Sequence, residues 1–379
     1  MSSAITLRPA PPDLPAALAN VVEYRKSGLS LNHVVGCPLD CGYCVRHLFG
    51  NFAMKRPHFV MPDEEAVAAL LAHWAFRADR TPIQIFNRAT DPLLPGVKDH
   101  LHHVLDLLDA KGLTNHVLVI TRWKLLAEDV ERFDRLRNLK LTVLVTWSGI
   151  DDRRIEPVDS AIAERSLATL AAHGVRTKHI LYWRPLIAGV NDSDAHIDRA
   201  RELARLADAT VFTGLFHRQE INDHFRSIGL PDLYDEVARR KILPREVEQH
   251  VIARFGDAPL FRKTSCGVAF AHGLPDYNGH YGVPDICDIC PARQLALCAD
   301  THHRPADADV AAVARLARLD PRDMRIEPGR VIVDNSNEQQ RYFMQHALGF
   351  QVQDRALPHL PGRHGRAEKG WSDGTAVGG

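Results

Sequence analysis

The sequence predicts an α/β protein built on a partial (β/α)6 TIM-like barrel, followed by a C-terminal α+β extension rich in cysteine. Two observations lead to this fold class. Strand-like and helix-like segments alternate between residues 31 and 218, which is typical of parallel strands joined by helical crossovers. Polar residues gather where those strands end, as at residues 87–91 and 121–122, and the C-terminal rim of a barrel carries its chemistry. Periodicity alone also fits a doubly wound sheet.

Short β-branched and apolar runs predict the strands of this barrel, and amphipathic segments predict its helices. The expected strands lie at residues 31–35, 82–86, 116–121, 141–146, 177–182 and 210–215. The expected helices lie at residues 64–78, 97–110, 124–136, 160–173 and 192–207.

Changes in composition divide the chain into four parts. Residues 1–30 are rich in proline and are expected to form an irregular lead-in, and residues 31–218 form the barrel. Residues 219–355 form the cysteine-rich domain, with helices at 232–241, 245–253 and 306–319 and a strand at 330–333. Residues 356–379, rich in glycine, histidine and charge, are predicted to be disordered.

Charge and hydropathy limit the environment of the protein. The 379 residues include 47 basic and 47 acidic ones, so the net charge of zero gives no general attraction to nucleic acid, although a local basic groove stays open. No apolar stretch is long enough for a membrane helix, and the N-terminal segment lacks the pattern of a secretory signal. We therefore expect a cytoplasmic protein without a membrane partner.

Three of the seven cysteines lie on one short segment. Cys37, Cys41 and Cys44 are separated by three and by two residues, directly after the first expected strand. Thiolates so close in sequence can occupy three corners of a [4Fe-4S] cluster, and Gly36 and Gly42 allow the backbone to fold tightly around it. Three ligands for four irons leave one iron open for a catalytic ligand.

The alternative for this segment is a zinc site or three packed thiols. Zinc normally takes four protein ligands. No fourth cysteine or histidine lies at a familiar spacing, although His33 and His47 are nearby. The spacing therefore favours an iron–sulfur cluster.

The cysteine spacing, with Tyr43 just before the last cysteine, resembles that of the radical S-adenosylmethionine (SAM) superfamily. Within that superfamily the chain is most similar to the spore photoproduct lyase-like branch, over about residues 20–215. The other segments that carry this resemblance are 90–95 (TDPLLP), 120–122 (ITR), 155–157 (IEP) and 184–192 (RPLIAGVND).

The resemblance implies that SAM chelates the open iron and is cleaved reductively to a 5′-deoxyadenosyl radical, with an electron donor such as flavodoxin or ferredoxin. It also implies contacts to SAM. Thr90 and Asp91 would lie near the amino group, Arg122 would face the carboxylate, Ser148 would assist with its hydroxyl, and Tyr43 would lie beside the adenine. For Thr90, Asp91 and Ser148, ordinary turn capping is the alternative.

The other four cysteines, Cys266, Cys287, Cys290 and Cys298, form a second group. Together they predict a second [4Fe-4S] cluster, with structural zinc as the alternative, because either metal accepts four thiolates. The spore photoproduct lyases do not carry this group. That departure and the neutral charge argue against repair of DNA lesions.

The leading interpretation is a radical SAM enzyme that modifies a small molecule or peptide. Three alternatives stay open. The first is an enzyme that modifies or repairs a nucleic-acid base, the second is transfer of the aminocarboxypropyl group of SAM to a soft acceptor, and the third is a metal-binding scaffold without catalysis.

Overall fold

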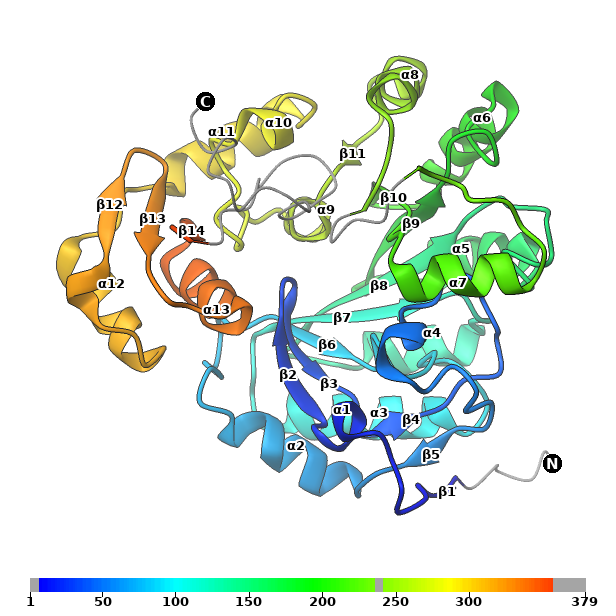
Figure 1. The fold of residues 1–379 in the computed structure, drawn as a ribbon, viewed down its shortest axis with the longest axis horizontal. Helices are drawn as coiled ribbons and strands as arrows, with labels where there is room; N and C mark the ends of the chain where they lie inside the picture. The colour runs from blue at the N-terminus through cyan, green and yellow to red at the C-terminus, as the bar shows by residue number, and fades with distance from the viewer. Residues whose placement is uncertain (1–6, 236–240, 357–379) are drawn as a thin grey trace.

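A computed structural model describes residues 7–235 and 241–356, and its centre is a sheet of eight strands (Figure 1). The strand order is β11-β10-β9-β8-β7-β6-β3-β2, and every neighbouring pair is parallel except the antiparallel pair β2 and β3. The sheet confirms the expected α/β partial-barrel class. Its strands are β2 (Val22–Arg25), β3 (Gly28–Leu31), β6 (Ile83–Ile85), β7 (His116–Thr121), β8 (Lys140–Trp147), β9 (Lys178–Leu186), β10 (Ala209–Gly214) and β11 (Leu260–Phe261).

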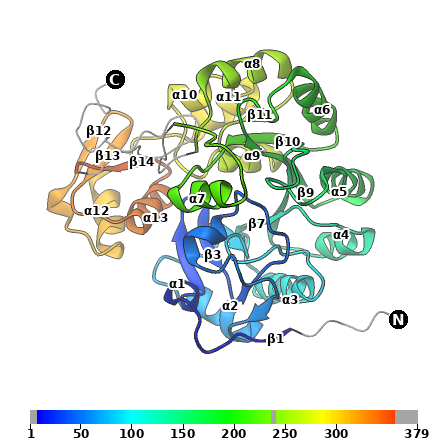
Figure 2. The same ribbon diagram turned by 45° about the vertical axis from the view of Figure 1, so that its right-hand side comes forward.

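Helices follow the strands on the outer face of the sheet, and several lie side by side in Figure 2. They are α2 (Asp63–Ala72), α3 (Val97–Ala110), α4 (Ala127–Asp134), α5 (Ser160–His173) and α6 (Asp194–Ala204). Side-chain caps fix two of the starts, because Asp159 accepts from the N–H of Ala161 and Ser193 accepts from the N–H of His196. The helix expected at residues 64–78 is shorter in the structure. Helix α2 ends at Ala72, because the backbone of the next residue, His73, is extended.

The start of the sheet differs from the expectation. Residues 22–31, which were expected to belong to an irregular lead-in, form the β2–β3 hairpin at the sheet edge. The expected strand at 31–35 is divided between β3 and β4 (Val34–Val35), which joins a small sheet with β1 (Arg8–Pro9) and β5 (His58–Phe59). Gly28 allows this geometry: its φ is +123°, and a Cβ there would lie 2.1 Å from the carbonyl oxygen of Pro82.

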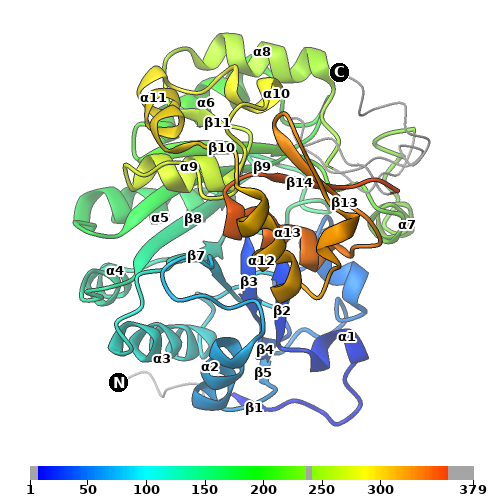
Figure 3. The same ribbon diagram turned by 90° about the vertical axis from the view of Figure 1, so that its left-hand side faces the viewer.

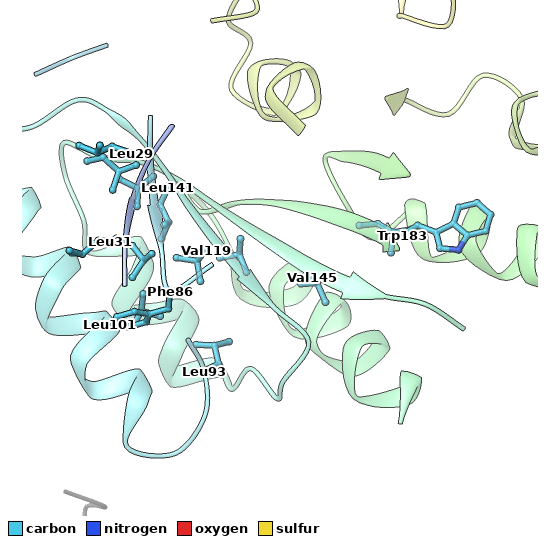
Figure 4. Close-up of a cluster of buried hydrophobic side chains, with 14 of the residues drawn as sticks. Leu29, Leu31, Phe86, Leu93, Leu101, Val119, Leu141, Val145 and Trp183 are labelled. Carbon is cyan, nitrogen blue, oxygen red and sulfur yellow. The ribbon is translucent and has the colours of Figure 1, made fainter. Parts of the chain in front are cut away.

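Alternation along the strands separates two apolar layers. Val117, Val119, Val143 and Val145 face the outer helices, and Figure 4 shows Leu31, Phe86 and Leu101 meeting between the sheet and α3. Leu118, Leu144 and Ile180 face the other way, into the concave side of the sheet. Successive side chains point to opposite faces, and both faces are covered, so the central strands carry apolar residues on both faces.

A helix of the cysteine-rich segment covers the concave side. Helix α9 (Thr264–Ala271) packs its Val268 and Phe270 into the inner layer, together with Phe261 of β11. Gly267 permits the close approach, since a Cβ there would lie 2.6 Å from Cγ2 of Val211 on β10. The sheet therefore continues beyond residue 218, the expected end of the barrel, and the cysteine-rich segment packs inside it.

The C-terminal part forms a separate small sheet of β12 (Arg325–Glu327), β13 (Arg330–Val333) and β14 (Gln351–Asp354) with helices α12 (Asp307–Leu316) and α13 (Glu338–Leu348) (Figure 3). It contacts the hairpin through Tyr24, whose hydroxyl lies 2.6 Å from Nδ1 of His346. The remaining helices are α1 (Ala16–Ala19), η1 (Val45–Phe49), α7 (Gln219–Ser227), α8 (Arg245–Phe255), α10 (Pro284–Cys287), α11 (Ala292–Thr301) and η2 (Pro321–Asp323).

The expected helices at 245–253 and 306–319 and the expected strand at 330–333 correspond to α8, α12 and β13. Most of the expected helix at 232–241, and the expected tail from residue 357 onward, lie outside the described residues. Among the helices of residues 7–235 and 241–356, none combines the length and the apolar character that crossing a membrane requires.

Candidate functional site

The first cysteine group lies on the loop between β4 and η1, at the C-terminal side of the sheet. Backbone hydrogen bonds hold this loop: the N–H of Cys37 donates to the carbonyl of Met54 (3.0 Å), and the N–H of Cys44 donates to that of Cys41 (3.0 Å). Cys37, Cys41 and Cys44 all line one cavity of about 520 Å³. The loop thus presents three thiols to a space that is large enough for a ligand.

Burial makes these thiols weak acids in the absence of a metal. Burial is the main cause that brings the pKa of Cys37 to about 11 and that of Cys41 well above the ordinary thiol value, and neighbouring cysteines add smaller contributions in the same direction. A thiolate here therefore needs a positive partner, which a bound metal supplies. Three thiols beside an open cavity fit a cubane cluster that keeps one iron free.

A buried ion pair lies beside the thiols. Nη1 of Arg122 lies 2.6 Å from Oε2 of Glu156, and the Tyr43 hydroxyl accepts from Arg122 and donates to Glu156. The Sγ of Cys41 lies 3.7 Å from Oε1 of the same glutamate. Burial lowers the pKa of Arg122, but the negative groups around it outweigh burial and keep the guanidinium charged.

Glu156 is the hub of this network, and the sequence did not single it out as a site residue. It is 3% exposed. Its only signal was its place in the 155–157 segment that carries the family resemblance. No local pattern reveals that a carboxylate after β8 will contact side chains of the cysteine loop and of the residue that follows β7.

Thr90 and Asp91 both line the cavity, as Arg122 and Tyr43 do. The Asp91 carboxylate is occupied by protein donors: it accepts from the hydroxyl of Thr121 (2.7 Å), the N–H of Arg122 (2.8 Å) and the N–H of Leu93 (3.0 Å). Burial raises its pKa, and these hydrogen bonds oppose the rise. The hydroxyl of Thr90 is buried and finds no hydrogen-bond partner within the described chain.

Ser148 lies apart from the other expected SAM contacts. It follows β8, it is 2% exposed, and it is absent from the cavity wall formed by the described residues. Its hydroxyl lies 3.3 Å from Oε2 of Glu156 and 3.3 Å from the N–H of Ile150. The structure thus gives Ser148 a contact to the network rather than to the cavity.

The second cysteine group lies on three short helices and one connecting loop: Cys266 in α9, Cys287 at the end of α10, Cys290 in the loop after α10, and Cys298 in α11. The four thiols are near enough that the other three raise the pKa of Cys266, beyond the rise that burial and Asp276 produce.

Two residues that the sequence did not single out join this group. The Sγ of Cys266 lies 3.8 Å from Oδ1 of Asp276 and 4.0 Å from Nδ1 of His280, and these three ligand atoms lie within 4.8 Å of one another. The backbone N–H of Asp276 and the side-chain amide of Gln294 donate to the Sγ of Cys298 (3.3 and 3.4 Å). Four thiols, an imidazole and a carboxylate are compatible with a second cluster or with zinc.

Comparisons with known proteins find similarity in structure alone. The sequence matches no protein-family model and no curated protein. Spore photoproduct lyase in complex with dinucleoside spore photoproduct is similar with a TM-score of 0.44 and 14% identity, covering 64% of this chain and 79% of that chain. SuiB of Streptococcus suis bound to S-adenosylmethionine is similar with a TM-score of 0.42 and 12% identity, covering 61% of this chain and 48% of that chain. Neither similarity assigns a ligand to this chain.

Proposed function

We propose that the protein is a radical SAM enzyme whose Cys37, Cys41 and Cys44 hold a [4Fe-4S] cluster at the cavity. The observation that carries the proposal is that Cys37, Cys41 and Cys44 lie on one loop and all line a cavity of about 520 Å³. When bound, the cluster would supply the electron that cleaves SAM reductively. An external donor such as flavodoxin or ferredoxin would supply that electron in turn, and the substrate would be a small molecule or a peptide.

The residues around the thiols would bind and orient SAM. The Thr90 hydroxyl, which lines the cavity, offers a hydrogen bond to the amino group, and the charged Arg122 offers one to the carboxylate. Asp91 would act as a positioning residue, because its carboxylate holds the backbone of Arg122 and the hydroxyl of Thr121. Tyr43 would contact the adenine with its ring while its hydroxyl holds Glu156 in place.

The test is formation of 5′-deoxyadenosine from SAM by the anaerobically reconstituted protein with dithionite as reductant. We expect the Cys37→Ala/Cys41→Ala/Cys44→Ala variant to form none, because the remaining loop offers no thiolate to the metal. Turnover of SAM by this variant at the wild-type rate would overturn the proposal.

Asp40→Asn is a matched control on the same loop. Asp40 has a positive φ of 51°, which Asn tolerates, and its exposed side chain pairs with Lys55. This variant should therefore keep the loop conformation and form 5′-deoxyadenosine as the wild type does. Loss of activity in both variants would show that the loop conformation, rather than the thiols, controls the reaction.

A further inference from the structure

The side chains on the concave side of the sheet change from apolar to polar toward the C-terminal ends of the strands, just beyond the layer that contacts α9. Leu144 of β8 pairs in register with Ile180 of β9, and both belong to the inner apolar layer. The next inward pair, Thr146 and Tyr182, lines the cavity, as Gln84 of β6 and Thr213 of β10 do. Side chains on one face of a strand repeat every two residues, so these positions form the floor of the cavity.

Three polar groups of this floor have no partner. Nε2 of Gln84, Oγ1 of Thr146 and Oγ1 of Thr213 are buried and form no hydrogen bond within residues 7–235 and 241–356. Their residues are 3–4% exposed. Buried polar groups in native proteins are almost always hydrogen-bonded, so these three groups on one cavity wall need a bound polar ligand or ordered water as a partner.

Positive charge is concentrated beside this floor. Arg184, Lys241 and Lys263 all line the cavity around Tyr182. The guanidinium of Arg184 lies over the Tyr182 ring at 4.4 Å and within 3.3 Å of its hydroxyl. Burial raises the pKa of Tyr182, but the charges of Lys241 and Arg184 outweigh burial and bring it to about 7. The lowered pKa of the phenol follows from the two cations that lie beside it.

Three carboxylates of the cavity wall have partners other than Arg184. Asp40 pairs with Lys55, Glu220 lies 3.9 Å from Arg218, and Asp91 accepts its three hydrogen bonds from protein donors. Arg184 forms no ion pair with any described residue.

The N-terminus of α9 points to the same ligand chemistry. Lys263 is the N-cap residue of this helix, and Thr264 and Ser265 of its first turn also line the cavity. The first N–H groups of a helix have no acceptor within the helix and carry partial positive charge, so they favour an anion.

We infer that this part of the cavity binds an oxyanion group, phosphate or carboxylate, of the substrate. We call it the cationic end and define it by Gln84, Thr146, Tyr182, Arg184, Thr213, Lys241 and Lys263. Arg184, Lys241 and the α9 N-terminus supply the positive charge, and Gln84, Thr146 and Thr213 supply hydrogen bonds. Burial lowers the pKa of Lys263 to about 7, so an anion beside it would favour its protonated form. The assignment of the anion to the substrate rests on the proposed function, in which SAM occupies the part of the cavity next to Cys37, Cys41 and Cys44.

The test is calorimetric titration of the reconstituted full-length protein with inorganic phosphate and, separately, with acetate, in the absence of reductant. We expect the wild type to bind at least one of the two anions, and the stronger binder identifies the class of oxyanion. Arg184→Gln should weaken that binding roughly 10- to 100-fold, the effect of losing a charge-assisted hydrogen bond. Arg322→Gln, at an exposed arginine paired with Asp320, is the matched control and should bind as the wild type does.

Thr213→Val keeps the test decisive if Arg184→Gln does not fold. This variant removes a buried hydroxyl without a partner, so it should fold at least as stably as the wild type and still bind the anion roughly 2- to 10-fold more weakly. Unchanged affinity in Thr213→Val and in Arg184→Gln would overturn the inference, as would a wild type that binds neither anion.

Two further outcomes separate this inference from the proposed function. Displacement of the anion by SAM would assign the cationic end to the carboxylate of the cofactor and would overturn the inference alone. Anion binding by a protein that does not cleave SAM would overturn the proposed function, because the titration requires neither reductant nor SAM turnover.

Discussion

The two ends of the cavity treat their polar groups in opposite ways. Next to the cysteine loop, which we call the cysteine end, Tyr43, Arg122 and Glu156 bond to one another, and Asp91 is saturated by protein donors. At the cationic end, side-chain groups of Gln84, Thr146 and Thr213 lack a hydrogen-bond partner among the described residues, and Arg184 contacts Tyr182 but forms no ion pair with a described residue. Apart from the Thr90 hydroxyl, which has no partner among the described residues, the first arrangement is formed by protein contacts alone, whereas we expect a ligand to complete the second. This contrast fits a constant cofactor at one end and a specific substrate at the other.

The largest expected effect is on metal content, because a different cysteine group lies next to each end of the cavity. If both groups hold cubane clusters, the reconstituted wild type should carry about eight irons per chain, and the Cys37→Ala/Cys41→Ala/Cys44→Ala variant should keep about four. If the second group holds zinc, that variant should hold one zinc and almost no iron. Elemental analysis of this variant distinguishes a second cluster from zinc. Finding neither iron nor zinc would show that the second cysteine group holds no metal.

The next largest effect concerns stability at the cysteine end. Arg122→Ala leaves the buried charge of Glu156 without a partner, which costs about 3–5 kcal/mol. Arg122→Ala combined with Glu156→Gln should recover most of that loss, since the unpaired charge is gone. Urea unfolding of the two variants measures the difference. Equal destabilisation in both would mean that Arg122 stabilises the fold by packing alone.

A smaller effect should appear at the cationic end as a pH dependence. The pKa of Tyr182 is depressed to about 7, compared with about 10 in the unfolded chain. An acid with a depressed pKa in the folded state stabilises the protein fully above the unfolded pKa and loses that contribution as the pH falls through the folded pKa. The unfolding free energy of the wild type relative to Tyr182→Phe should therefore rise between about pH 7 and pH 10. A difference that stays constant over this range would refute the positive potential.

The smallest expected effects separate two of the predicted SAM contacts. Ser148→Ala removes a hydroxyl that touches the network but not the cavity, so it should lower stability by about 0.5–1.5 kcal/mol and leave SAM affinity unchanged. Thr90→Val removes a cavity hydroxyl without a described partner and should weaken SAM binding roughly 2- to 10-fold. Equilibrium binding of SAM to the two variants measures the difference. Weaker binding in Ser148→Ala than in Thr90→Val would mean that Ser148, and not Thr90, contacts SAM.

The parts of the fold that depend on local periodicity could be predicted from the sequence. The strands β7, β8, β9 and β10 and the helices α3 and α5 follow from β-branched runs and amphipathic spacing. The hairpin at residues 22–31 was missed because its strands are short and follow a proline-rich segment, and only the alternation in Val22–Arg25 indicated it. Helix α9 was also missed, because a short helix buried on most sides has no amphipathic pattern to detect.

Some residues of the candidate site could likewise be predicted from the sequence, and others could not. The cysteine spacing, together with family resemblance, was enough to select Tyr43, Thr90 and Arg122, and the structure places all three on the cavity wall. Glu156 and His280 could not be selected, because their roles arise from contacts between segments more than a hundred residues apart or between short irregular ones. The unpaired groups of the cationic end depend on strand register, which periodicity does not define across a sheet.

In the proposed function, a cluster at Cys37, Cys41 and Cys44 would bind SAM through an open iron. Electron paramagnetic resonance of the dithionite-reduced protein, recorded with and without SAM, tests it most directly. We predict that SAM changes the spectrum of the wild type, because a ligand to an iron alters its electronic environment, and that it leaves any signal of the Cys37→Ala/Cys41→Ala/Cys44→Ala variant unchanged. A wild-type spectrum that SAM does not change, or the same change in the variant, would contradict the account.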